Sequence, residues 1–332
     1  MQADAAGGGR SQHDAGKTSA NRSSWQATRL FAWLQLFRAP NLLTVPGDPI
    51  AGFVLAAAIP GEDISRPGLR MGFAAAVALL LYSAGLLWND WFDLPEDQRE
   101  RPGRPLPSGR IRTGHVPLVA NVLVALAVST AAIAGRATLW VAVALGIVVL
   151  AYDWFLKRLP LAGPLAMGCC RGLSVLIGAA AFGGAGLTAP PVLAASAGIT
   201  LYVAAVTWLA RGETKRRPVS AQRVAIALAF VVWMAAVAAG LHAVGDAAAR
   251  WVWAMLAMAA MGLLWVVGCL AALGGVPVPA KVQRVVGGLI RGIILAQAAL
   301  VLTAGWTGFG LAVALMACFL INRALGRVFY AS

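Results

Sequence analysis

Ten long apolar runs constrain this sequence more than any other feature. Each is close to the ~20 residues that a helix needs to cross about 30 Å of hydrocarbon, and the last is only marginally long enough. A chain in a bilayer must satisfy its backbone hydrogen bonds within helices or in a closed barrel, and no strand-like alternation appears. We therefore expect an all-α polytopic membrane protein with nine to ten transmembrane helices, ten being favoured. The predicted spans are residues 40–59, 70–89, 116–134, 138–156, 163–184, 190–210, 220–242, 249–272, 283–304 and 308–326.

Composition agrees with this class. Of the 332 residues, 60% are hydrophobic and 12% are charged, whereas a soluble domain carries roughly a quarter charged residues. The net charge of +14 comes from basic residues gathered in particular loops, which indicates membrane topology and an anionic substrate rather than nucleic acid. The four cysteines all lie in apolar runs without CxxC spacing, so we interpret them as small hydrophobic residues.

The basic residues also predict the orientation of the chain. Residues 1–24 are expected to be a disordered tail and residues 25–332 one transmembrane domain, with 25–38 starting at the membrane surface. With the N-terminus and the acidic loop on the cytoplasmic side, alternate connections carry most of the positive charge. Those connections hold Arg99, Arg101, Arg104, Arg110, Arg112, Lys157, Arg158, Arg211, Lys215, Arg216, Arg217, Arg223, Lys281 and Arg284, against Arg66, Arg70, Arg136 and Arg250 on the opposite side.

An acidic cluster, NDWFDLPED at residues 89–97, ends the second apolar run. Carboxylates are costly beside hydrocarbon, so this cluster is a candidate functional site. If the helix continues, Asn89, Asp90, Asp93 and Asp97 share one stripe, and a divalent cation would relieve their repulsion. Oxygen ligands without nearby His or Cys favour Mg²⁺. However, Pro95 predicts that the helix ends near Phe92, in which case Asp97 would reach the site from a loop.

The following loop, residues 98–114, is rich in Arg, Pro and Gly. Guanidinium groups on a loop stiffened by proline suit bidentate capture of phosphate oxygens, and Arg99, Arg101 and Arg104 are the candidates. Together with a Mg²⁺ site they would describe a diphosphate site. The alternative is an ordinary basic cytoplasmic loop, which leaves the regular spacing of the aspartates unexplained.

Asp48 is a charged residue inside the first span, between Pro46 and Pro49. It follows Asn41 by seven residues, which predicts one shared helix face. Two hypotheses remain open: these two residues bind or deprotonate an acceptor molecule, or Asp48 neutralises Arg171 in the fifth span as a buried ion pair without a substrate role. Arg171 itself is a candidate for facing the metal site.

Several motifs together resemble the UbiA superfamily of membrane prenyltransferases. They are N-D-x-x-D-x-x-x-D from Asn89, R-x-R-P-x-R-P-L-P-S-G from Arg99, RAPNLLT at 38–44 and YDWFLKR at 152–158. The resemblance implies a helical bundle around a central cavity, with Mg²⁺ ionising an isoprenyl diphosphate whose prenyl group passes to an acceptor. It also implies that Tyr152 and Asp153 face the cavity, whereas Lys157 and Arg158 are equally explained as topogenic charge.

One stretch departs from the family pattern. The superfamily has a second Asp-rich motif after the sixth span, whereas this sequence reads TWLARGETKRR at 207–217, with Glu213 between Arg211 and Lys215. Either one metal suffices and these basic residues replace the second cation, or the diphosphate chemistry is altered. This stretch, PGDP at 46–49 and MGCCRGLSVLIG at 167–178 are similar to UbiA-like proteins encoded in ebo operons.

The function predicted from these features is Mg²⁺-dependent prenyl transfer in a bacterial inner membrane, with an isoprenyl diphosphate, a prenyl acceptor and the bilayer as partners. Two alternatives remain: a lipid or anion carrier that keeps the diphosphate-binding half, and a polyprenyl-phosphate sugar-phosphate transferase. The predicted catalytic residues are Asp48, Asp90, Asp93 and Asp97, and the metal ligands Asn89, Asp90, Asp93 and Asp97. The predicted substrate-binding residues are Asn41, Arg99, Arg101, Arg104, Tyr152, Lys157, Arg158, Arg171, Arg211 and Glu213.

Overall fold

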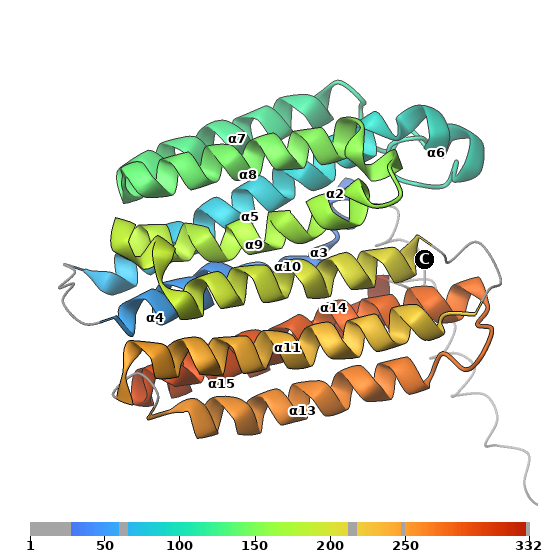
Figure 1. The fold of residues 1–332 in the computed structure, drawn as a ribbon. Coiled ribbons are helices and arrows are strands. Elements are labelled where there is room, and N and C mark those ends of the chain that lie inside the picture. The colour runs from blue at the N-terminus through green and yellow to red at the C-terminus, as the bar shows by residue number, and fades with distance from the viewer. Residues whose placement is uncertain (1–27, 60–65, 212–217, 247–249, 330–332) are drawn as a thin grey trace, which may run out of the picture.

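The structure, a computed structural model, describes residues 28–59, 66–211, 218–246 and 250–329, and over these residues it contains helices and no strand. The predicted disordered tail, 1–24, lies outside the described residues. Figure 1 shows the long helices side by side with their axes roughly aligned. The helices are α2 Arg29–Leu36, α3 Ala39–Leu42, α4 Gly47–Ala57, α5 Pro67–Phe92, α6 Leu94–Glu100, α7 His115–Ala134, α8 Arg136–Trp154, α9 Ala162–Phe182, α10 Pro190–Ala210, α11 Ser220–Val244, α13 Val252–Ala271, α14 Pro279–Val301 and α15 Trp306–Phe329, with short 3-10 turns η1 Leu156–Arg158, η2 Gly184–Thr188 and η3 Leu302–Ala304.

Nine helices in the described ranges are long and apolar enough to cross a membrane. The predicted span at 40–59 is not among them, because it is divided into α3 and α4. Proline has no backbone N–H, so Pro46 and Pro49 remove donors that a continuous helix would need at this point. Asn41 and Asp48 consequently lie on different helices, and the prediction that they share one helix face is wrong.

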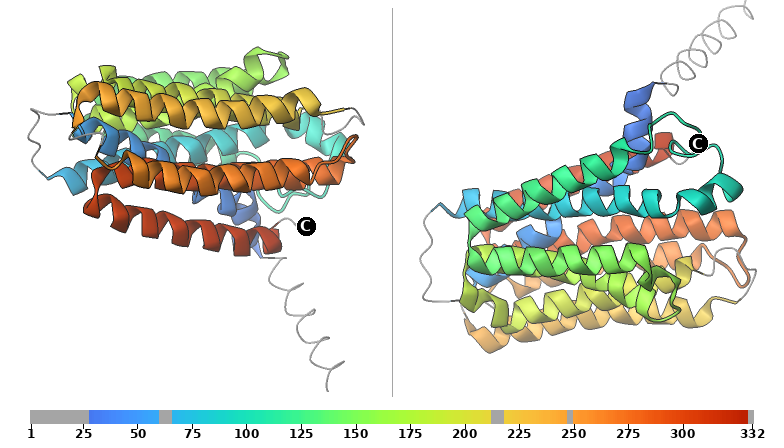
Figure 2. Two further views of the ribbon diagram at one scale, coloured as in Figure 1. Left: turned by 60° about the horizontal axis from the view of Figure 1, so that its bottom comes forward. Right: turned by 90° about the horizontal axis from the view of Figure 1, so that it is seen from above.

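The divided first span is packed at the centre of the bundle. α4 contacts α9, α14, α5 and α10, so it is surrounded by other helices. Its approach to α9 is close enough to require glycine: a Cβ at Gly52 would overlap the carbonyl oxygen of Val175, and one at Gly178 would overlap that of Pro49. Small residues allow helix backbones to come together in this way within a membrane. Figure 2 shows α15 lying outside α14, away from this centre.

Among the described residues, the antiparallel connections bring the predicted basic segments to one end of the bundle. α6 lies beyond that end, and the α7–α8 turn lies at the opposite end (Figure 1). The turn at the opposite end is tight because Gly135, at φ 140°, adopts a conformation that L side chains rarely accept. The end that carries α6 is called the basic end below.

The acidic segment itself bends at the position that proline predicts. α5 ends at Phe92, Asp93 caps it, and α6 begins at Leu94 with Pro95 in its first turn. Pro95 is tolerated there because the first N–H groups of a helix have no intrahelical acceptor. Asp97 therefore projects from a short second helix, rather than from α5 or from a loop.

Candidate active site

The three aspartates of the acidic segment each pair with a different basic side chain. Asp93 lies 2.5 Å from Lys157 Nζ, Asp97 lies 2.6 Å from Arg104 Nη1, and Asp90 lies 3.6 Å from Arg38 Nη2. The basic partners come from three other segments of the chain, so ion pairs connect these segments to α5 and α6 at this end of the bundle. We call these six residues and Asn89 the mouth cluster.

Lys157 is the best connected cation of the mouth cluster. It lies in η1, just after α8, and its ammonium group donates to Asp93 Oδ1 at 2.5 Å and to Asn89 Oδ1 at 3.3 Å. Asn89 and Asp93 are one turn apart at the end of α5, so their oxygens face the same way. One amide oxygen and one carboxylate oxygen therefore accept hydrogen bonds from the same ammonium group.

Asp153 adds a carboxylate to the same region. It lies in α8, one turn before Lys157, and is 3% exposed; its Oδ2 has no hydrogen-bond donor among the described residues. A Cβ placed on Gly85 would lie 4.0 Å from that oxygen, so the carboxylate faces α5 one turn deeper than Asn89. A buried carboxylate oxygen without a donor is costly unless a cation satisfies it.

This donor set suits Mg²⁺ in its chemistry. Carboxylate and amide oxygens are the ligands that hard divalent cations take, and Asn89, Asp93 and Asp153 supply them from two adjacent helices. Across the described parts of the chain, however, no three His, Cys, Asp or Glu side chains are close enough together to form a complete metal site. The assignment of Asn89, Asp90, Asp93 and Asp97 as metal ligands stays a prediction.

Asp97 and Arg104 fold the start of the loop back on α6. Arg104 Nη1 donates to both Asp97 oxygens, at 2.9 and 2.6 Å, and Asp97 is buried. Arg99 and Arg101 remain exposed at the end of α6. Arg104 is thus engaged with an aspartate, while Arg99 and Arg101 are placed at the surface of the basic end, and the phosphate-binding role of all three stays a prediction.

Arg211 ends α10 and binds backbone carbonyl groups. Its guanidinium donates to Leu159 O at 2.5 Å and to Arg158 O at 3.1 Å. A Cβ on Gly163 would lie 2.5 Å from Arg211 Nη1 and 2.9 Å from Leu156 O, so the missing side chain leaves room for the guanidinium. Arg211 therefore holds the segment that follows Lys157.

The remaining predicted residues of this region are placed as follows. Tyr152 is half-buried in α8, next to Asp153, and the Arg158 side chain is exposed in η1. Glu213 lies outside the described residues. The substrate-binding roles of these three residues stay predictions.

A second polar cluster lies deeper in the bundle. Arg171 Nε is 2.7 Å from Asp48 Oδ2, and its Nη2 donates to Thr44 O at 2.7 Å. Gln297 of α14 donates to Asp48 Oδ1 at 2.6 Å and to Thr44 O at 2.8 Å. The interruption between α3 and α4 frees the Thr44 carbonyl, and two side chains satisfy it. We call Thr44, Asp48, Arg171 and Gln297 the inner cluster.

The inner cluster answers one question left open by the sequence. The hypothesis that Asp48 neutralises Arg171 is confirmed as far as the ion pair itself is concerned. Asn41 accepts a backbone hydrogen bond from Thr44 and is half-buried in α3. Roles of Asn41, Asp48 and Arg171 toward a substrate stay predictions.

Sequence analysis assigned no role to three residues that make polar contacts here: Arg38, Gln297 and Asn322. Arg38 lies inside the quoted motif RAPNLLT, so its position was available. Gln297 stands alone in an apolar run, and Asn322 donates to Pro40 O from α15. An uncharged polar residue deep in a predicted span is the signal that would have found the last two.

Comparison with known proteins decides the family. The model of the UbiA prenyltransferase family matches residues 49–271, which is most of the helical bundle. The chain belongs to the UbiA prenyltransferase family. With its nine long apolar helices in the described ranges, it is an integral membrane protein.

A curated relative is the digeranylgeranylglyceryl phosphate synthase of Methanosarcina mazei, 32% identical over 172 residues. That match covers 48% of this chain and 58% of the relative, so the chain spans little more than half of the relative's length. Among solved structures, the apo UbiA homologue of Aeropyrum pernix K1 has a TM-score of 0.58 at 19% identity and covers 79% of this chain and 97% of its own. A UbiA homologue of Archaeoglobus fulgidus, bound to GPP and Mg²⁺, has a TM-score of 0.50 at 14% identity, covering 81% of this chain and 99% of its own. These likenesses confirm the predicted bundle fold.

Proposed function

We propose that this protein transfers a prenyl group from an isoprenyl diphosphate to an acceptor within the membrane, and that it requires Mg²⁺. The observation that carries the proposal is the convergence of the Asn89 and Asp93 oxygens on one cation, Lys157, above the unsatisfied carboxylate of Asp153. The structure of an Archaeoglobus relative bound to GPP and Mg²⁺ supports the same choice of donor and metal.

In the proposed reaction, the bond between the first prenyl carbon and the diphosphate oxygen breaks, and both electrons leave with the diphosphate. Mg²⁺, when bound, neutralises charge on the departing diphosphate oxygens. Asn89, Asp93 and Asp153 would hold the metal, and the Lys157 ammonium would turn from the aspartate toward the diphosphate. Arg99 and Arg101, exposed beside α6, would bind the outer phosphate oxygens. An electron pair of the acceptor then forms the new bond to the allylic carbon, and the released diphosphate takes up the proton that the acceptor loses.

The stretch that lacks the second Asp-rich motif has a proposed role of its own. Arg211 holds the carbonyl groups of Arg158 and Leu159, and so fixes the segment that carries Lys157. We assign to Lys157 the fixed positive charge that a second metal ion would otherwise provide. With Lys157 in this role, one Mg²⁺ ion is sufficient to balance the charge of the diphosphate.

For Asp48 the geometry favours the ion-pair hypothesis over the catalytic one. Its side chain is fully buried and both of its oxygens already have partners, Arg171 and Gln297. We propose that the inner cluster closes the interruption of the first span and shapes the inner wall of the bundle. Proton transfer from the acceptor to Asp48 is the competing hypothesis.

The finer identity of the substrates is also a proposal. A relative named as a digeranylgeranylglyceryl phosphate synthase supports a long isoprenyl donor and a phosphate-bearing lipid acceptor. The sequence resemblance to proteins of ebo operons would instead leave the acceptor open. We place the mouth cluster on the cytoplasmic side of a bacterial inner membrane, because the positive charge gathers at the basic end.

The proposal is tested with purified protein, Mg²⁺ and radiolabelled isoprenyl diphosphates of several chain lengths, in detergent with a panel of lipid acceptors. Release of diphosphate should require Mg²⁺ and should fall by about 10²-fold or more in Asp93→Ala. Glu96→Ala is the matched control, since Glu96 is an exposed carboxylate one residue before Asp97 and takes part in none of the ion pairs of the mouth cluster.

Three outcomes are informative. Loss of release in Asp93→Ala with normal release in Glu96→Ala supports the transferase. Donor binding without release under any acceptor contradicts it and favours the carrier. Equal rates of diphosphate release by Asp93→Ala and Glu96→Ala would show that the mouth cluster takes no part in the reaction.

A further inference from the structure

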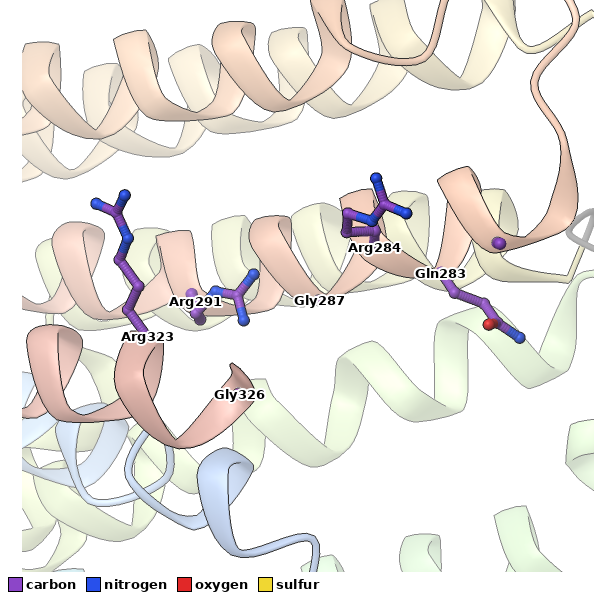
Figure 3. A pocket seen from close by; sticks show the side chains of 7 residues that line it. Gln283, Arg284, Gly287, Arg291, Arg323 and Gly326 are labelled. Carbon is purple, nitrogen blue, oxygen red and sulfur yellow. The ribbon is translucent and has the colours of Figure 1, made fainter. Parts of the chain in front are cut away.

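A pocket of about 420 Å³ lies between α14 and α15, apart from the mouth cluster. Three arginines on two helices supply its charged groups, and none of the described residues that line it is acidic. Figure 3 shows Arg284 and Arg291 projecting from α14 and Arg323 from α15. The lining residues are Ala280, Gln283, Arg284, Gly287, Arg291, Arg323 and Gly326.

The spacing of small and basic residues creates this pocket. Arg284 and Arg291 are seven residues apart, so they lie on one face of α14 two turns apart. Gly287 stands between them without a side chain, and Figure 3 shows Arg291 extending along α14 toward it. On α15, Arg323 is followed one turn later by Gly326, which leaves the facing side open as well.

Arg291 is the residue whose position most needs an explanation. It is the thirteenth residue of α14, so its backbone lies roughly 18 Å along the helix from the basic end. Its Nε is buried and has no hydrogen-bond partner among the described residues. A guanidinium at such depth is costly unless a counter-charge or water satisfies it.

The protein supplies no counter-charge within the part of the chain that the structure describes. The four ion pairs found there involve Arg38, Arg104, Lys157 and Arg171, and none involves a pocket arginine. Three positive charges around one space repel each other, and the repulsion is removed when an anion enters. The pocket thus has two properties of a site for an anionic ligand: its charged groups are positive, and Arg291 Nε is a hydrogen-bond donor without an acceptor.

We propose that this pocket binds the phosphate group of an anionic membrane lipid. Guanidinium groups match phosphate oxygens in pairs of hydrogen bonds, and three of them from two helices line this one pocket. Basic pockets between transmembrane helices on the cytoplasmic side bind lipid headgroups in this way. The site is separate from the proposed diphosphate site, which uses α5, α6 and α8, and it lies beyond residues 49–271 that match the family.

The test measures lipid retention by native mass spectrometry after delipidation in detergent. Phosphatidylglycerol, phosphatidylcholine and inorganic phosphate are titrated separately against the full-length chain. We expect wild-type protein to retain phosphatidylglycerol, and the exposed pair Arg284→Gln with Arg323→Gln to bind it roughly tenfold more weakly or worse. Arg291→Gln should have the same effect, and a thermal melt of each variant shows whether it is folded.

Lys281→Gln is the matched control, because Lys281 is an exposed basic residue on the same helix that does not line the pocket. It should change phosphatidylglycerol retention by less than about twofold. Preferential binding of inorganic phosphate, lost in the same pocket variants, would assign the site to a soluble phosphate instead and overturn the lipid assignment. Retention of phosphatidylglycerol by the folded double variant at the wild-type level would overturn the site itself.

Discussion

The inner cluster and the mouth cluster both pair aspartates with basic side chains, yet they differ in access to solvent. The Asp48 and Arg171 side chains are 0% and 9% exposed, and Gln297 and Thr44 supply further hydrogen bonds. In the mouth cluster, Asp93 is 25% exposed and Lys157 14%, while Arg38 is 44% exposed. Buried charges must keep their partners, whereas exposed partners can be exchanged for a ligand. The difference predicts that one cluster determines stability and the other determines activity.

The largest stability effect is expected from Arg171→Met. The change leaves the Asp48 carboxylate buried without its counter-charge, which typically costs 3–5 kcal/mol. Thermal and denaturant unfolding in detergent would measure it. Replacing both partners, Asp48→Leu with Arg171→Met, should recover most of that loss because no unpaired charge remains. A double variant as unstable as the single one would show that the pair is not the source.

Asp48→Asn should have a smaller effect on stability and tests the competing catalytic role. The amide keeps an oxygen for Gln297 but leaves Arg171 without a negative charge, so we expect a loss of about 1–3 kcal/mol. Prenyl transfer by the folded fraction should stay within about twofold of wild type. A folded Asp48→Asn protein with turnover reduced by about 10²-fold or more would establish Asp48 as the proton acceptor instead.

Lys157→Met should have the opposite profile, with the smallest change in stability of the three. The Lys157–Asp93 pair is partly exposed, at 14% and 25%, so its loss should cost about 1 kcal/mol, the upper end of the range for exposed ion pairs. Turnover should nevertheless fall, by about tenfold or more, because the fixed charge beside the diphosphate is lost. Arg112→Met is the matched control: Arg112 is an exposed basic residue of the loop after α6, and no ion pair of the described residues involves it. Equal losses of turnover in both variants would indicate a general charge effect.

The sequence predicted the spans and the family well because each rests on local patterns. Apolar runs of membrane length identify helices one at a time, and Pro95 predicts the end of α5, which falls three residues before it at Phe92. The division of the first span was less accessible. Pro46 and Pro49 signalled an interruption, but the residues that satisfy it, Arg171 and Gln297, are 127 and 253 residues from Thr44 in sequence.

The same limit applies to the candidate site. The acidic stripe was visible in the sequence, whereas the pairing of each aspartate with a separate basic residue was not. Lys157 reaches Asp93 across 64 residues, and nothing in the local sequence of either residue specifies that contact. Arg211 was predicted beside the diphosphate, but its guanidinium binds backbone carbonyl groups. That contact depends on how closely the end of α10 approaches Gly163, which the local sequence does not specify.

The most direct test of the account is calorimetric binding of a non-cleavable isoprenyl diphosphate analogue, with and without Mg²⁺, to wild-type protein and to Asp93→Asn. The account predicts that Mg²⁺ strengthens binding to the wild type by about tenfold or more and that Asp93→Asn loses this gain, while Glu96→Gln keeps it. If Asp93→Asn bound the analogue with the same Mg²⁺-dependent affinity as the wild type, the mouth cluster would not be the metal and diphosphate site.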